Sequence, residues 1–423
     1  MKKIIKLLIL TIIIGHPSLS TVHAQYNTIT EHERSLWNQT MEHYLQDTLW
    51  NQFNWYDAGH FVMVPMHAAY RHREEGWIED IRGLMKRWSV ADLDAFKETI
   101  EPVNKNMYTL DWVHYAYLLS RFIVLEPDAS EVTEMIAQYL DEEIHRLWVE
   151  YPAWMWDRAD FDGGMRERIS WKLDNTRNIV YRAIFDVELF VLAIAADLLQ
   201  YEKRHGRTLK HSETHKEVAE YAYVVHKSEV VYTNGNAWLF QPGIWTVHPD
   251  YAYAGHHEKG ENLEEKHVPG IGQDSSHAFR TPLWLVSMRD MYSREEERWA
   301  YYDQLLEGLA KQLLDTVIIA PSKEFRGVRL TNYMCGHNGL YRYNHTTVSK
   351  VGDAAGAYQE SACFLLGWWS FTENNEIKNL HGQMAECFPI SGDELILYTG
   401  MNTTRKRNKF IELPDGFHRG LYC

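Results

Sequence analysis

Three segments of the chain pair an aspartate with a histidine three residues later. They are Asp57-Ala-Gly-His60, Asp111-Trp-Val-His114 and Asp274-Ser-Ser-His277. Residues three apart lie on one face of a helix, and an aspartate at a helix start can cap the free backbone N–H groups. Each pair is therefore predicted to stand over the first turn of an apolar helix. Repeated helix starts that converge would form a cup lined by acids and imidazoles, the groups that transfer protons near neutral pH.

The segment of residues 272–280 adds a guanidinium to one of these pairs. Asp274 is expected to cap a helix, His277 to face the cleft one turn further, and Arg280 to follow along the same face. His277 would then act as a base or orienting donor, and Arg280 would neutralise a substrate carboxylate. The alternative is structural, with a capping aspartate, a histidine bonded to a neighbouring helix and an arginine in an ion pair.

A second candidate segment, residues 332–345, concentrates hydrogen-bond donors and aromatic rings. Its candidate residues are Asn338, Tyr341, Arg342, Asn344 and His345. A lyase acting on a uronic acid must neutralise the carboxylate, remove the C5 proton and protonate the leaving oxygen, and these residue types supply all three functions. The alternative is a hydrogen-bonded surface loop.

A third segment, residues 241–257, contains Trp245 and Tyr253, which suit the apolar faces of a sugar ring. We predict no resident cofactor, because neither an HExxH motif nor a Cys-pair spacing is present. A divalent metal is the alternative, held by imidazoles and a carboxylate. Its candidate ligands are His248, Asp250, His256 and His257.

A glycoside hydrolase instead needs two carboxylates facing each other across the scissile bond, about 5 to 10 Å apart. Five acids stand near the starts of expected inner helices, namely Asp57, Asp111, Asp186, Asp274 and Glu360. Glu360 is the most conspicuous, since it begins the last of these helices. The alternative for Glu360 is a solvated first-turn acid favoured by the helix dipole.

Apolar residues recur at helical spacing in pairs of segments. After a first helix over residues 31–51, the expected pairs are 59–73 with 78–88, 110–124 with 131–149, 178–203 with 212–231, 276–292 with 294–317, and 354–371 with 373–387. Three long loops precede inner helices and should gather on one rim, at residues 154–171, 234–273 and 321–353. Residues 395–398 and 409–412 predict a small β-hairpin. These elements predict one all-α domain over residues 25–423, with a C-terminal extension from about residue 392.

The chain begins with features of an export signal. Lysines at positions 2, 3 and 6 precede the apolar run 7–14, and Val22-His23-Ala24 predicts cleavage after Ala24. Residues 1–24 are thus expected to be a signal peptide and the protein to be periplasmic or secreted. No later stretch reaches the roughly 18 apolar residues of a membrane span. Export permits disulfides, and Cys335 with Cys363 is the expected pair.

Composition restricts the class of partner. A net charge of −15 disfavours nucleic acid and anionic membranes. The 16 Trp and 25 Tyr suit carbohydrate binding, although most of these rings are expected to fill the core.

The paired helices, the segment Gly272-Gln-Asp-Ser-Ser-His277-Ala-Phe-Arg280 and the aromatic loops at helix starts resemble the α/α-toroid superfamily. This superfamily includes six-hairpin glycosidases and several polysaccharide lyases. The resemblance covers most of the chain as architecture and residues 274–280 as a motif. It implies a ring of about five to six helical hairpins that binds a glycan at the N-terminal ends of its inner helices.

The sequence therefore predicts an exported enzyme that cleaves a polysaccharide or oligosaccharide. Lyase chemistry is favoured because histidine, tyrosine, asparagine and arginine dominate the rim loops; the alternatives are a glycoside hydrolase and a non-catalytic glycan-binding protein. The predicted catalytic residues are His277, Tyr341, His345, Asp274 and Glu360. The predicted substrate-binding residues are Asp57, His60, Asp111, His114, Trp245, Tyr253, Arg280, Asn338, Arg342 and Asn344.

Overall fold

The structure is a computed structural model that describes residues 29–45, 55–87, 105–150, 164–175, 180–343, 354–387, 390 and 392–398. These residues are mostly helical and contain only two small antiparallel sheets. The prediction of a helical chain is confirmed at this level. The expected signal peptide lies outside the described residues.

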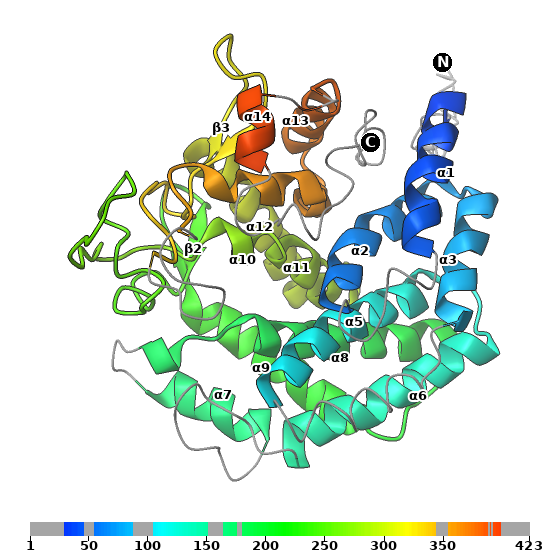
Figure 1. Cartoon of the computed structure of the whole chain (residues 1–423). Coiled ribbons are helices and arrows are strands. Elements are labelled where there is room, and N and C mark those ends of the chain that lie inside the picture. Colours follow the sequence, from blue (N-terminus) through cyan, green and yellow to red (C-terminus); the bar gives the residue numbers. More distant parts are fainter. Residues whose placement is uncertain are drawn as a thin grey trace, which may run out of the picture.

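Four helices lie next to one another in chain order, and we call them the inner helices. They are α2 (Trp55–His72), α5 (Lys105–Leu125), α8 (Asp186–His205) and α11 (Thr281–Asp290), and each contacts the next. Each is followed in the chain by a helix that packs against it, which we call an outer helix. The outer helices are α3 (Glu75–Arg87), α6 (Glu131–His145), α9 (Ser212–Glu229) and α12 (Glu297–Gln312). In Figure 1, α3 and α6 lie outside α2 and α5.

The remaining elements cover the ends of these pairs. The helical ones are α1 (Glu31–Leu45), η1 (Arg146–Glu150), α7 (Met165–Asp174), η2 (Val180–Arg182), α10 (Ser275–Ala278), η3 (Leu313–Val317), η4 (Gln359–Leu366), η5 (Trp368–Thr372), α13 (Asn375–Ala385) and α14 (Gly392–Tyr398). Strand β1 (Val230–Tyr232) pairs with β2 (Trp238–Phe240), and β3 (Ile318–Ile319) pairs with β4 (Arg329–Leu330). η4 contacts α2 and η5 contacts α11, so the last segment lies between the first and fourth inner helices.

A buried polar network joins three inner helices. Asp197 on α8 accepts hydrogen bonds from Arg121 Nη1 at 2.6 Å and from Ser120 Oγ at 2.7 Å. Arg121 also donates to Ser287 Oγ on α11 at 3.0 Å. All four side chains are buried, and most of their buried neighbours on these helices are apolar. The network therefore fixes how α5, α8 and α11 are aligned along their axes, which apolar packing alone leaves less specified.

A second buried cluster fixes the start of α8. Glu188 binds Arg168 Nε at 2.9 Å and Lys172 Nζ at 2.7 Å, and both cations belong to α7. Its carboxylate also accepts the backbone N–H of Phe185 at 3.0 Å, the residue that caps α8. Asp186, the first residue of α8, is held in place by these contacts.

Several predicted elements need correction. The helix expected over 178–203 begins only at Asp186, and the loop expected over 154–171 contains the start of α7. The helix expected over 354–371 is two 3₁₀ segments, because Tyr358 and Gly367 adopt left-handed backbone angles that interrupt an α-helix.

The predicted strand at 395–398 is part of α14, in which the Tyr398 hydroxyl reaches the core and donates to Val328 O at 2.6 Å. A run of four apolar residues does not distinguish strand from helix; residues 409–412 lie outside the described residues.

The predicted disulfide is also wrong. Cys335 and Cys363 are free thiols, as is Cys387. Cys363 lies buried on η4, where it packs as a small apolar residue. Among the described residues, no helix is both long and apolar enough to span a bilayer, in agreement with the prediction.

Asp197→Asn should lower the free energy of unfolding by about 3–5 kcal/mol, because it leaves the Arg121 guanidinium buried without a counter-charge. Urea denaturation measures this loss. Asp315→Asn is the matched control: its carboxylate is about half exposed and pairs with Lys311 on the surface, so the expected change is below about 1 kcal/mol. Equal effects of the two substitutions would contradict a special role for Asp197.

Candidate functional site

The N-terminal ends of the inner helices meet around Arg280. This residue caps α11, and its guanidinium binds His60 Nε2 at 3.1 Å, Asp186 Oδ2 at 3.1 Å and the Tyr56 hydroxyl at 2.6 Å. His60 and Tyr56 come from α2, and Asp186 comes from α8. One side chain thus connects the starts of three inner helices.

The histidines of the first two Asp-x-x-His segments lie in the same place. The rings of His60 and His114 are 4.5 Å apart, and Tyr56 packs against His114 at 4.1 Å. Burial lowers the pKa of His114 well below its ordinary value, and the nearby His60, Arg280 and His277 lower it further. His114 is therefore neutral at physiological pH.

The expectation that all three aspartates begin helices is only partly correct. Asp274 is the N-cap of α10, and its side chain accepts the backbone N–H of His277. Asp111, in contrast, lies in the second turn of α5, because that helix already begins at Lys105. Asp57 lies in the first turn of α2, and its side chain is outside the described part of the chain.

Arg280 has a different position from the one predicted. Its side chain is almost completely buried, and the three partners above use its donors. A guanidinium in this state has little capacity to bind a substrate carboxylate. The structural alternative, an arginine in an ion pair, describes Arg280 better.

Asp274 and His277 form an acid–imidazole pair. His277 Nδ1 lies 2.8 Å from Asp274 Oδ1 and 3.0 Å from Oδ2, so this nitrogen carries the proton that the carboxylate accepts. Nε2 has no hydrogen-bond partner among the described residues, and 27% of the His277 side chain is exposed. The exposed nitrogen can accept a proton from a bound molecule.

Two tyrosines surround this pair. Tyr251 donates its hydroxyl to Asp274 Oδ2 at 2.5 Å, and the Tyr341 hydroxyl lies 3.5 Å from His277 Nδ1. Burial favours the neutral acid at Asp274, yet its hydrogen bonds and the His277 charge hold the pKa below its usual range. Burial raises the pKa of Tyr341 well above its ordinary value, so the phenol keeps its proton at neutral pH.

Arg342 is a cation of the candidate site, and its side chain is partly exposed to solvent. It follows Tyr341 directly, lies 5.0 Å from the centre of the Tyr341 ring and donates to Asp250 Oδ2 at 3.2 Å. Its side chain is 23% exposed, compared with 2% for Arg280. Arg342 is therefore better placed than Arg280 to meet an anionic substrate.

Other predicted residues hold the loops in shape. Asn338 Oδ1 accepts the backbone N–H groups of Asn332 and Tyr358. Glu360 is buried at the start of η4, where its N–H donates to Asn332 Oδ1 at 3.3 Å, so it is not a solvated first-turn acid.

The two predicted sugar-binding rings, Trp245 and Tyr253, are buried. Trp245 stacks on Tyr251 with ring centres 5.5 Å apart, and Tyr253 packs on Tyr343 with ring centres 4.6 Å apart. Asn344 and His345 lie outside the described residues.

The alternative metal ligands of the 241–257 segment do not form a ligand set. His248 Nδ1 accepts the backbone N–H of Asp250 at 3.1 Å. His256 and His257 each bond to a backbone carbonyl oxygen instead.

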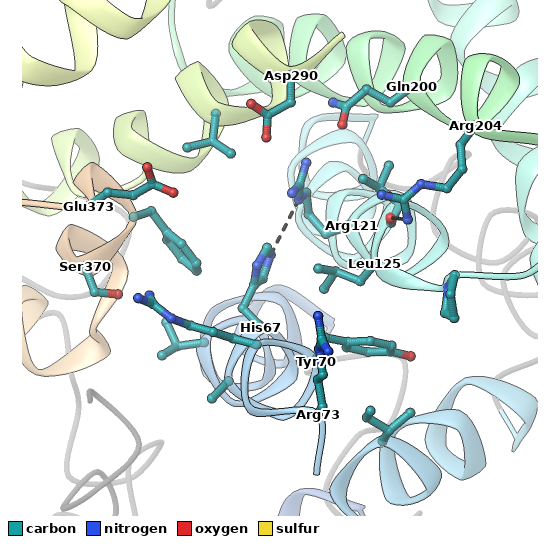
Figure 2. Close-up of a pocket in the computed structure, with 18 of the residues that line it drawn as sticks. His67, Tyr70, Arg73, Arg121, Leu125, Gln200, Arg204, Asp290, Ser370 and Glu373 are labelled. Atoms are coloured by element: carbon teal, nitrogen blue, oxygen red, sulfur yellow. Dashed lines mark hydrogen bonds between the residues drawn. The ribbon is translucent and has the colours of Figure 1, made fainter. Parts of the chain in front are cut away.

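A cavity of about 920 Å³ lies at the opposite ends of the inner helices. Its lining includes His67 on α2, Arg121 on α5, Arg204 on α8 and Asp290 on α11, so these helices run in the same direction (Figure 2). His67 Nε2 faces Arg121 Nε at 3.5 Å, and burial and that charge lower its pKa well below normal. The cavity offers cations but not the acid–imidazole pair of the other end, which remains the candidate site.

Sequence reasoning did not assign the contacts that support the Asp274–His277 pair and Arg342. Tyr251 and Asp250 lie far from Asp274 and Arg342 in the chain, so their contacts depend on how the 241–273 loop folds back. Tyr56 precedes the first Asp-x-x-His segment by one residue and could have been included from that proximity. Asp186 was identified only as an acid, not as the partner of Arg280.

Stability should depend on Asp274 at low pH. Because its folded pKa is lowered, its contribution is present above the unfolded pKa of about 3.9 and is lost as the pH falls from there toward the folded value. Asp274→Asn should therefore reduce the pH dependence of the unfolding free energy between about pH 5 and 2, measured by urea denaturation. Asp315→Asn should retain the wild-type dependence, and the same retention in Asp274→Asn would contradict the assignment.

Comparisons with known proteins place no further constraint on this site. No protein-family model, no curated protein and no solved structure matches the chain. Any function assigned to the chain therefore depends on the geometry of the residues described above.

Proposed function

We propose that the chain is an exported polysaccharide lyase of the α/α-toroid type that cleaves a uronic-acid polymer next to His277. The observation that carries the proposal is the Asp274–His277 pair. Among the described residues, His277 Nε2 has no hydrogen-bond partner, 27% of the side chain is exposed, and Tyr341, which Arg342 follows directly, lies next to it. The export assignment depends on the composition of residues 1–24.

The contacts between helices support the toroid. The inner helices contact one another in chain order, and η4 and η5 lie between α11 and α2, as a ring of about five inner segments requires. The N-terminal ends meet around Arg280, and the C-terminal halves line one cavity. A glycan site at the N-terminal ends agrees with where the polar residues gather.

The proposed reaction is a β-elimination. Arg342 binds the uronate carboxylate, which makes the C5 proton easier to remove. His277 Nε2 takes that proton, the C4–O bond breaks, and a C4–C5 double bond forms. The departing oxygen receives a proton from Tyr341, whose raised pKa keeps the phenol protonated until then. Asp274 orients the imidazole and stabilises its charged form.

Glycoside hydrolysis has less support from the same residues. A hydrolase needs a carboxylic acid whose pKa is raised, so that it can protonate the leaving oxygen. The pKa of Asp274 is lowered instead, and Asp186 and Asp250 are bound to arginines. We therefore favour elimination over hydrolysis.

His277→Ala should reduce the rate of elimination by about 10²–10⁴-fold, because it removes the base. The assay incubates the protein with polyuronates and follows the ultraviolet absorbance of the unsaturated product. Tyr341→Phe should cause a comparable loss, whereas His267→Ala removes an exposed histidine of the 241–273 loop and should leave the rate unchanged. A wild-type rate in His277→Ala would remove His277 from the mechanism, and new reducing ends without ultraviolet absorbance would identify a hydrolase.

Arg342→Ala should raise KM for a polyuronate about 10-fold or more, because charge-assisted hydrogen bonds contribute about 1.5–3 kcal/mol. The same polymer with methyl-esterified carboxyl groups is the control substrate, and the variant should discriminate less between the two polymers than the wild type. An equal loss on both polymers would mean that Arg342 acts through the loop and not on the carboxylate.

A further inference from the structure

The cavity at the C-terminal ends of the inner helices is unevenly charged. Its volume of about 920 Å³ is that of a pocket for a small organic molecule. Six of its lining residues are arginines or lysines, whereas three are acids. This excess of cations occurs in a chain whose net charge is −15.

The acids of the lining already have cationic partners. Asp290 Oδ1 lies 2.8 Å from Arg289 Nε, and Glu373 Oε2 lies 3.6 Å from Nη1 of the same arginine, which is not a lining residue. Glu75 pairs with Arg82 at 3.2 Å. The acids therefore balance cations other than the remaining ones of the lining.

Three cations of the lining have no acidic partner. Arg71, Arg204 and Lys378 form no ion pair with a carboxylate in the part of the chain that the structure describes. Arg204 donates from Nη1 to the carbonyl oxygens of Val124 and Glu126, and its Nε and Nη2 groups have no hydrogen-bond partner among the described residues. These donors remain available to a bound molecule.

The unpaired cations lie close to other cations. Burial and the charge of Arg71 lower the pKa of Lys378, and the nearby Glu373 offsets this effect only in part. Burial and the charge of Arg121 lower the pKa of Arg204 in the same way. Figure 2 shows Arg204 and Glu373 on opposite sides of the cavity, so the two pairs of like charges belong to different walls. Like charges disfavour each other, and an anion bound beside each pair would remove that cost.

The helix dipole does not account for all of these cations. Arg71 and Arg204 lie in the last turns of α2 and α8, where the dipole favours positive charge. Lys378, in contrast, is the fourth residue of α13 and lies near the end at which the dipole disfavours a cation. Its position in the lining therefore needs another explanation.

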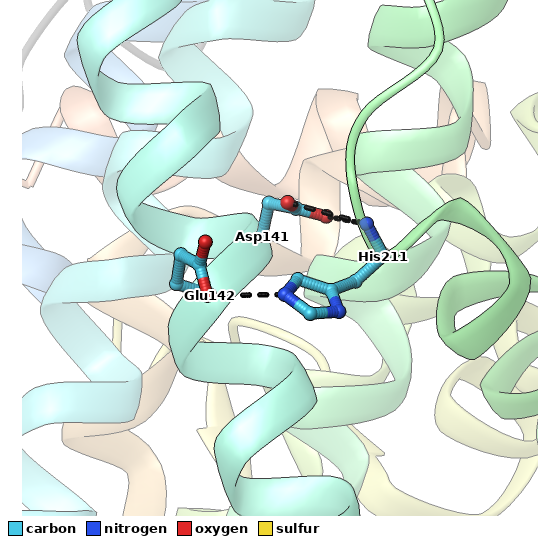
Figure 3. A group of neighbouring side chains, drawn as sticks. All are labelled: Asp141, Glu142 and His211. Atoms are coloured by element: carbon cyan, nitrogen blue, oxygen red, sulfur yellow. Dashed lines mark hydrogen bonds and ion pairs between the residues drawn. The ribbon is translucent and has the colours of Figure 1, made fainter.

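The polar cluster between α6 and α9 shows the more usual arrangement, in which charges are balanced internally. The His211 backbone N–H donates to Asp141 Oδ1 at 3.0 Å, and Glu142 accepts from Lys210 at 2.8 Å and lies 3.0 Å from His211 Nε2 (Figure 3). Each carboxylate of that cluster is thus bound by residues 210–211. The unpaired cations of the cavity differ from it in this respect.

We propose that this cavity binds a small organic molecule that carries two anionic groups, either carboxylates or phosphates. One group binds Arg71 and Lys378, and the other binds the free donors of Arg204, since guanidinium groups bind both kinds of anion through paired hydrogen bonds. Phe371 and Val286 also line the cavity and suit the carbon skeleton of the ligand. The site lies at the opposite end of the inner helices from the acid–imidazole pair, and this inference does not depend on the proposed function.

The test titrates the full chain by isothermal titration calorimetry with four probes: a disaccharide of two uronic acids, a sugar bisphosphate, inorganic phosphate and a neutral disaccharide. We expect at least one of the two dianions to bind saturably and about 10-fold or more tightly than inorganic phosphate, because only a dianion reaches both pairs of cations. The tighter dianion identifies the anionic group as carboxylate or phosphate. The titrations are repeated with Arg342→Ala, which removes the accessible cation of the other end and should leave binding to the cavity unchanged.

Lys378→Gln should weaken binding of that dianion about 10-fold, because it removes a charge-assisted hydrogen bond. The Lys378 side chain has no ion pair among the described residues, so the variant should fold, which far-ultraviolet circular dichroism checks. Lys86→Gln is the matched control: it removes an exposed cation of α3 that does not line the cavity, and its affinity should equal that of the wild type.

Three results would each overturn the proposal. They are the absence of saturable binding by both dianions, equal affinity of Lys378→Gln and the wild type, and binding of inorganic phosphate or of the neutral disaccharide as tightly as the dianion.

Discussion

The structure depends on a carboxylate buried between three helices. Asp197 has no exposed surface, and its charge is balanced by Arg121 on the neighbouring inner helix. Burying either charge without its partner costs free energy. The two helices are therefore held at the axial position at which the carboxylate and the guanidinium meet. Ser287 extends this constraint to α11. This contact fixes the axial positions of helices whose apolar faces could otherwise slide along one another. It therefore also fixes the positions of the residues at the helix ends.

The common direction of the inner helices divides the polar groups into two sets. Asp186 and Asp274 lie at helix N-termini, where the helix dipole favours negative charge. Arg204 lies in the last turn of α8 and donates to the carbonyl oxygens of Val124, in the last turn of α5, and of Glu126, just beyond it. The Asp274–His277 pair thus lies at one end, and the cavity at the other end is lined by cations such as Arg121 and Arg204 together with acids such as Asp290. The helix dipole favours cations near helix C-termini, so the cations of the cavity do not by themselves indicate a second active site.

Sequence patterns identified much of this arrangement because the signals were local. The apolar periodicity predicted the helical pairs, and the spacing within 274–280 predicted the Asp274 cap and the His277 pair. The three histidines of the Asp-x-x-His segments do come together, through the ring contacts of His60 and His114 and the proximity of His277 to His114. Two predictions failed. Residues 392–398 are helical because the buried Tyr398 contacts residues far away in the chain, and the two 3₁₀ segments follow from left-handed residues that periodicity does not detect.

The different positions of two arginines show why residue type alone does not assign a role. Arg280 lies in the motif that drew attention first, yet it is enclosed by Tyr56, His60 and Asp186. Arg342 occupies a loop position with a positive φ of 59° and keeps part of its side chain in solvent. Backbone strain of this kind is tolerated where surrounding contacts impose it, and here the Arg342 N–H donates to Asp250 O at 2.8 Å while its side chain binds the Asp250 carboxylate. The fold therefore uses one arginine to assemble the helix starts and holds the other at the surface that a carboxylate can approach.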